Sequence, residues 1–223
     1  MKTKTFVSII ALLLVTICSE NVQSSVGPEK TFPDSQLNPS SKKIKILIDT
    51  DANNDLDDQH ALAYAFLNEE VFDIVGVTVN NTIALALEKA PEIIDNVKVV
   101  WLGANYPEPG EYNLVNDTTS VNPVIESGVE FEMVTVRYGK PSGTDAVRVT
   151  PKEIRKQVAG KGPVTDKPIT GRHGGEFSNF GDYSVNLFEH IDLPGNPPSR
   201  ALLDMAAVAI VKNPEWAEQK TIP

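Results

Sequence analysis

The sequence predicts an α/β fold with an open, mostly parallel, Rossmann-like sheet and helices on both faces. Between residues 45 and 102, apolar runs of strand length alternate with segments of helical spacing. The first run, Lys45–Ile48, is short, apolar and bounded by charge, which is typical of a buried parallel strand. An alternating order of strands and helices predicts parallel strands joined by right-handed crossovers.

Each expected element has a local reason. The segment 60–68 combines strong helix formers with apolar spacing, and Pro91 marks a kink or the end of the following helix. Thr150 is a candidate cap for a later helix, and most of 139–200 is expected to form loops because Gly and Pro are frequent there. In chain order we expect strands at 45–48, 73–79, 97–102 and 132–136, and helices at 60–68, 83–94, 121–126, 151–158 and 201–211.

The N-terminal residues 1–24 predict a signal peptide, because two lysines precede an apolar run and small and polar residues end at Ser24. Residues 25–41, rich in Pro and Ser, are expected to be a linker, and 42–223 one α/β domain. This predicts a secreted or periplasmic protein. Two alternatives are a retained N-terminal anchor and lipid attachment at Cys18, the only cysteine, which would bring the protein to a membrane.

The formal net charge is −10. Such a chain repels phosphate backbones, so nucleic acid is excluded as an expected partner, whereas cations and small neutral ligands fit. The predicted domain has no cysteine and therefore no disulfide. Homo-oligomerisation stays open.

An aspartate cluster follows the first strand. Five aspartates lie between Asp49 and Asp58. In open parallel sheets, ligands bind beyond the carboxyl ends of the strands, and carboxylates so close together repel one another unless a cation neutralises them. Oxygen ligands suit Ca²⁺ or Mg²⁺ better than zinc. The alternative is a solvated acidic turn that caps the next helix without any metal.

The segment ILIDTDANNDLDDQHALAYAF resembles the N-terminal motif of the inosine–uridine-type nucleoside hydrolases, in the subgroup with a longer DTDANN turn. Later segments resemble further motifs of that family, in the family's order. They are TIALAL from Thr82, WLGAN from Trp101, EYN from Glu111 with Asp117, and LLDMAAVA around Asp204.

The resemblance implies hydrolysis of the N-glycosidic bond of ribonucleosides by a water that Ca²⁺ activates. It implies that Asp51 is the general base and also a metal ligand, together with Asp58 and Asp204. The longer turn makes Asp55 an additional candidate ligand, and Asp49 would shape the site. The residues implied for the sugar hydroxyls are Asn105, Glu111 and Asn113.

Two departures from the family are visible. Leu203 stands where the family often has a histidine near the leaving base, which leaves His60, His173 and His190 as candidate proton donors. The joint between Val79 and Ile83 also lacks a stretch that family members carry. We therefore expect an incomplete sheet with exposed apolar faces and reduced activity.

Two rival functions remain open. A haloacid dehalogenase-like Mg²⁺ phosphatase also places DxD after its first strand, and Asp49 would be its nucleophile. However, Asn53 stands where that family needs Thr or Val. A non-catalytic secreted protein that binds Ca²⁺ and a sugar is the other rival, favoured by the missing stretch and by Leu203.

Overall fold

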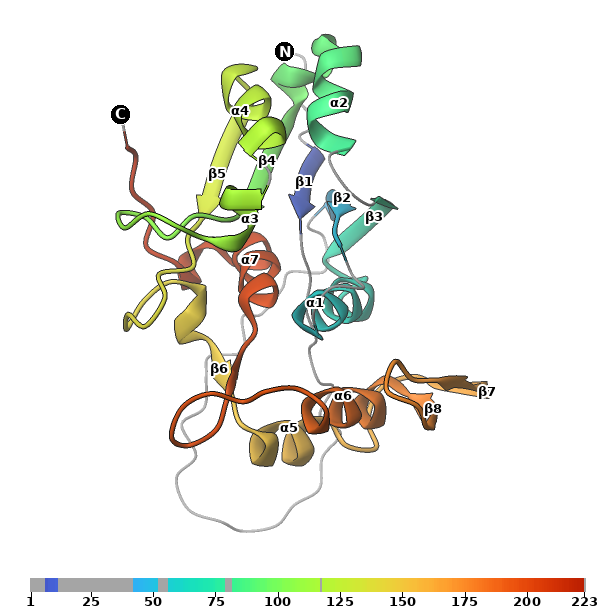
Figure 1. The fold of residues 1–223 in the computed structure, drawn as a ribbon. Coiled ribbons are helices and arrows are strands. Elements are labelled where there is room, and N and C mark those ends of the chain that lie inside the picture. Colours follow the sequence, from blue (N-terminus) through green and yellow to red (C-terminus); the bar gives the residue numbers. More distant parts are fainter. Residues whose placement is uncertain (1–6, 12–41, 52–55, 79–81, 117, 223) are drawn as a thin grey trace.

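The computed structural model describes residues 7–11, 42–51, 56–78, 82–116 and 118–222, and it has an α/β fold (Figure 1). Its main sheet has five parallel strands in the order β3-β2-β1-β4-β5. The strands are β1 (Val7–Ala11), β2 (Ile44–Asp49), β3 (Phe72–Thr78), β4 (Val97–Leu102) and β5 (Glu130–Val134). Strands β2 to β5 lie within two residues of the predicted boundaries.

Helices flank the sheet and extend the fold beyond its carboxyl edge. They are α1 (Leu56–Leu67), α2 (Thr82–Lys89), α3 (Tyr112–Asn116), α4 (Thr118–Glu126), α5 (Pro151–Val158), α6 (Phe180–Glu189) and α7 (Leu203–Lys212). Short 3-10 helices are η1 (Pro91–Asn96), η2 (Thr144–Ala146) and η3 (Pro214–Trp216). The helix predicted at 83–94 is two elements, because Pro91 begins η1 after α2 has ended. No helix in the described part of the chain is long and apolar enough to cross a membrane.

Helices pack on both faces of the sheet, as predicted. On one face, Ile46 and Leu102 pack with Ala65 of α1 and Val208 of α7. On the other, Val99 packs with residues of α2 and α4. Alternate residues of β4 therefore face different helical layers, which explains why every residue of this strand except Lys98 is apolar.

The edge strand β3 exposes two large apolar side chains, Val75 and Val77. In α2, Leu85 is also exposed. Exposed apolar surface was expected from the short joint between β3 and α2.

A further core lies below the sheet in Figure 1, where α5 and α6 pack together. Ile154 and Phe188 are buried there with Leu56 at the start of α1 and Leu202 before α7. The short strands β6 (Arg148–Val149) and β9 (Arg200–Ala201) pair beside it, and β7 (Val164–Thr170) and β8 (Glu176–Asn179) form a projecting hairpin. The expectation of loops was wrong for β7, β8 and α6.

Part of the predicted leader lies inside the sheet. Residues 7–11 form β1, which pairs in parallel with both β2 and β4. Residues 12–41, with Cys18, the predicted cleavage site and the linker, lie outside the described residues. Cleavage at residue 24 would remove the middle strand, so the signal peptide stays a prediction.

We predict that a chain lacking residues 1–24 unfolds at lower urea concentration than the full chain, because β2 and β4 each lose a parallel partner. Urea titration of both chains, followed by far-UV circular dichroism, measures this. Equal midpoints would show that the sheet does not need β1, and would favour the leader assignment.

Candidate metal centre

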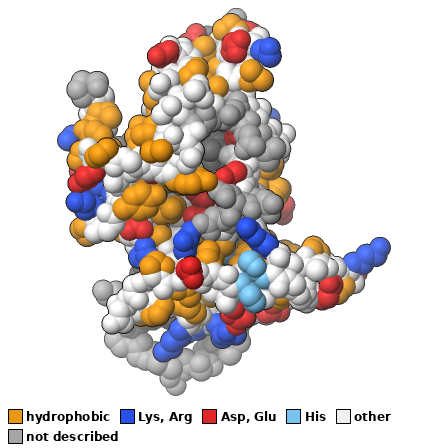
Figure 2. All heavy atoms as spheres, in the orientation of Figure 1, with side chains coloured by type: hydrophobic (Ala, Val, Ile, Leu, Met, Phe, Trp, Pro, Cys, Tyr) orange, Lys and Arg blue, Asp and Glu red, His pale blue; other side chains and the backbone are white. Residues whose placement is uncertain are grey.

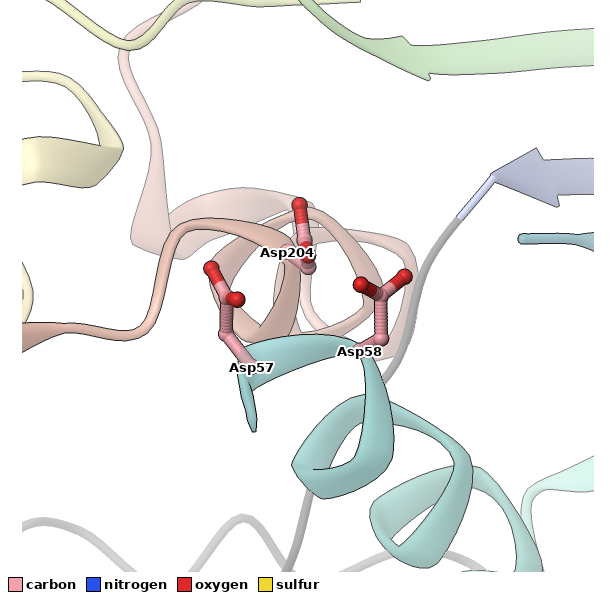
Figure 3. A group of neighbouring side chains, drawn as sticks. All are labelled: Asp57, Asp58 and Asp204. Carbon is pink, nitrogen blue, oxygen red and sulfur yellow. The ribbon is translucent and has the colours of Figure 1, made fainter. Parts of the chain in front are cut away.

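Three buried carboxylates meet where two helices begin. Asp57 and Asp58 lie in the first turn of α1, and Asp204 lies in the first turn of α7 (Figure 3). One carboxylate oxygen from each lies within 4.8 Å of the others. A single cation with oxygen distances of about 2.3–2.6 Å can span such a separation. The structure thus brings together Asp58 and Asp204, which are 146 residues apart in the sequence, and it adds Asp57 to them.

Burial makes this cluster electrostatically costly. Only 2% of Asp57, 2% of Asp58 and 8% of Asp204 is exposed to solvent. Burial, together with the charges of Asp51 and Asp57, raises the pKa of Asp58 to about 7, against the lowering effect of the hydrogen bond that the Thr50 hydroxyl donates. A proton or a cation must therefore neutralise part of the cluster near neutral pH. The alternative of a solvated acidic turn does not describe these buried groups.

The helix ends contribute to the geometry. The backbone N–H of Leu203 donates to Asp57 Oδ2 at 3.2 Å, so a carboxylate from α1 caps the start of α7. Helix N-termini favour negative charge, which offsets part of the cost of burial. Sequence reasoning had given Asp57 no ligand role. Its position beside Asp58 in the first helical turn was the available signal.

The remaining aspartates of the motif have different positions. Asp51, the predicted base, is exposed but lies close enough for its charge and a side-chain hydrogen bond to raise the pKa of Asp58. Asp55 lies outside the described residues. Asp49 is buried and accepts hydrogen bonds from the Thr78 hydroxyl at 3.2 Å and from the Thr82 backbone N–H at 3.1 Å. Asp49 therefore holds β2, β3 and the start of α2 together.

The three predicted sugar-binding residues make hydrogen bonds within the protein. Glu111 is buried and accepts from the backbone N–H groups of Ala104, Asn113 and Leu114. The Asn113 amide donates to the Leu102 carbonyl at 3.1 Å. These bonds hold the loop after β4, in which Ala104 has a left-handed backbone (φ 63°).

Asn105 belongs to the same loop. Its side-chain oxygen accepts from the Tyr138 backbone N–H at 2.8 Å, which links the loop after β4 to the one after β5. The role of all three residues in binding a sugar stays a prediction. Their observed contacts fix the loops at the carboxyl edge of the sheet.

His60, one candidate proton donor, belongs to the core. It is 1% exposed, and its two ring nitrogens are bonded to the Leu56 carbonyl and the Ser184 hydroxyl. Burial lowers the pKa of His60 to about 4, so the ring is neutral near pH 7. His173 and His190 are exposed, and their rings stack with centroids 5.0 Å apart.

No protein-family model, curated protein or solved structure matches this chain. The resemblance to nucleoside hydrolases therefore rests on the sequence motifs alone.

We predict that Ca²⁺ raises the Tm more at pH 8 than at pH 5.5. Without metal, the pKa of Asp58 is higher in the folded protein than in the unfolded chain. The protonated carboxyl therefore stabilises the fold at low pH, and this contribution is lost as the pH rises through about 7. Ca²⁺ needs the ionised carboxylate, so its effect grows over the same range. Thermal denaturation at pH 5.5 and pH 8, with Ca²⁺ or with EDTA, measures the Ca²⁺ effect on the Tm at each pH. An equal Ca²⁺ effect at the two pH values would contradict this.

We also predict that Asp58→Asn stabilises the metal-free protein at pH 8 by about 1–3 kcal/mol and abolishes stabilisation by Ca²⁺. The amide removes one charge from the cluster but still accepts from Thr50. Asp166→Asn, in the exposed strand β7, is the matched control and should change neither quantity. An unchanged response to Ca²⁺ in Asp58→Asn would exclude this carboxylate as a ligand.

Proposed function

We propose that this chain is a metal-dependent N-ribosyl hydrolase that cleaves the N-glycosidic bond of ribonucleosides with Ca²⁺ as its cofactor. One observation carries the proposal. Asp58 and Asp204, the two ligands that the family resemblance implies for distant parts of the chain, lie in one buried cluster. The cluster forms at the carboxyl edge of a parallel sheet, where such folds bind their ligands.

The donor set fits the proposed ion. Three buried carboxylates offer only oxygen ligands, which Ca²⁺ prefers, and their mutual repulsion favours a divalent cation. When bound, Ca²⁺ supplies orientation and a lowered pKa to a water molecule. Asp57, Asp58 and Asp204 are the residues that would hold it.

The chain's own residues provide the proton transfer and the charge. Asp51 is exposed to solvent beside Asp58, so it can take a proton from an attacking water. N-glycosidic cleavage develops positive charge on the sugar ring, and a cluster of carboxylates stabilises that charge. His60 does not protonate the leaving base, because it is neutral and both of its nitrogens are engaged.

Two observations bear on the rival functions. A phosphatase would use Asp49 as its nucleophile, but Asp49 is buried and its two oxygens accept from Thr78 and Thr82. This argues against phosphoryl transfer.

The internal hydrogen bonds of Glu111 and Asn113, together with Leu203 in place of a histidine, favour a protein that binds Ca²⁺ without catalysis. This is the second candidate function.

We predict that Asp51→Asn lowers kcat for ribose release by about 10²–10⁴-fold, the usual contribution of a general base, with an unchanged circular dichroism spectrum. The assay measures ribose from a panel of purine and pyrimidine ribonucleosides with Ca²⁺ or EDTA. Wild-type activity that survives in Asp51→Asn would exclude this residue as the base.

The matched control is Asp95→Asn, in η1 before β4, at the amino end of the sheet and therefore away from the site. It should keep wild-type activity. Wild-type protein that binds Ca²⁺ but releases no ribose would favour the binding protein. Release of phosphate from esters with Mg²⁺ would favour the phosphatase.

A further inference from the structure

A cavity of about 180 Å³, partly open to solvent, lies between α5 and the start of α7. Its walls come from α1, from α5, from the strand β6 with the residue before it, and from the start of α7. Most of the lining is aliphatic and includes Val147, Ile154, Val158, Leu202 and Met205. Apolar walls of this kind offer water no hydrogen-bond partners.

The polar residues of the wall are engaged elsewhere. His60 is neutral, and its two ring nitrogens are bonded to Leu56 and Ser184. The guanidinium of Arg148 is hydrogen-bonded within the protein. Its Nε and one terminal nitrogen donate to Ser199, and the other terminal nitrogen donates to Asp145 at 2.8 Å. Its aliphatic stem is left to line the cavity.

The size of the cavity limits the ligand further. An engineered apolar cavity of about 150 Å³ in another protein binds benzene or xenon, so the space here suffices for a single small ring. Sugars, phosphates and charged groups are unsuitable, because their polar atoms would lose water and gain no partner from this wall.

We propose that this cavity binds a small, uncharged, apolar molecule of about the size of benzene or toluene. The site is separate from the acidic cluster but shares an element with it. Leu202 and Met205 line the cavity, and Asp204, between them in sequence, points into the cluster (Figure 3). The ligand therefore packs against the helix end that positions a proposed metal ligand. The proposal does not depend on the hydrolase function.

Figure 2 shows how charged side chains gather on one face of the molecule. Acidic side chains appear inside a central hollow, and Lys and Arg side chains border it (Figure 2). The cavity, in contrast, is lined mainly by aliphatic side chains.

The test is a titration of the full chain with benzene, followed through methyl resonances in ¹H–¹³C correlation spectra. We expect a saturable shift of the Met205 methyl signal, one of only three methionine signals in the chain. At ten times the Kd, benzene should raise the Tm by roughly 3–6 °C. Pyridazine, a polar ring of the same shape, should neither shift the Met205 methyl signal nor raise the Tm. Absence of a saturable shift with benzene, or an equal shift with pyridazine, would overturn the proposal.

Two variants fill the cavity in different ways. Val158→Phe enlarges a buried side chain of the wall, and Val147→Trp places a ring at the rim, where Val147 is 41% exposed and a larger side chain is tolerated. Both should lose the benzene response. Val164→Trp, on the exposed hairpin strand β7, is the matched control and should keep it. Binding that persists in the rim variant would overturn the proposal even if Val158→Phe fails to fold.

Discussion

The burial of three carboxylates between the first turns of α1 and α7 is the constraint on which this structure depends. Like charges so close together in a poorly solvated space oppose folding unless something neutralises them. The high pKa of Asp58 expresses this conflict, and the bond from Leu203 to Asp57 joins the two helix ends in spite of it. A buried cluster of this kind can hold a cation.

The polar residues around this edge divide into two groups. Asp49 and Glu111 are buried and accept backbone N–H groups, so they shape the loops and helix starts that surround the cluster. Asp51 is exposed beside Asp58 and is the group that meets solvent. A sequence motif rich in carboxylates therefore contains structural and chemical members. Burial and hydrogen-bond partners, rather than residue type, distinguish them.

Local patterns predicted the strands β2 to β5 and the helices α1, α2, α4 and α7, because apolar period and chain order determine those elements. The pairing of Asp58 with Asp204 was foreseen only through the family resemblance. The role of Asp57, the engagement of Glu111 and the neutral state of His60 depend on contacts between distant segments, which no local pattern contains. The hairpin β7–β8 was missed because its Gly- and Pro-rich sequence lacks strand periodicity.

The central claim is that carboxylates from α1 and α7 hold one divalent cation between them. Calorimetric titration of the metal-free chain with Ca²⁺ at pH 8, for wild type and Asp204→Asn, tests it most directly. The account predicts one Ca²⁺ per wild-type chain and an affinity at least about tenfold weaker in the variant, since one charged ligand is lost. Equal affinities, or no Ca²⁺ bound by the wild type, would contradict it.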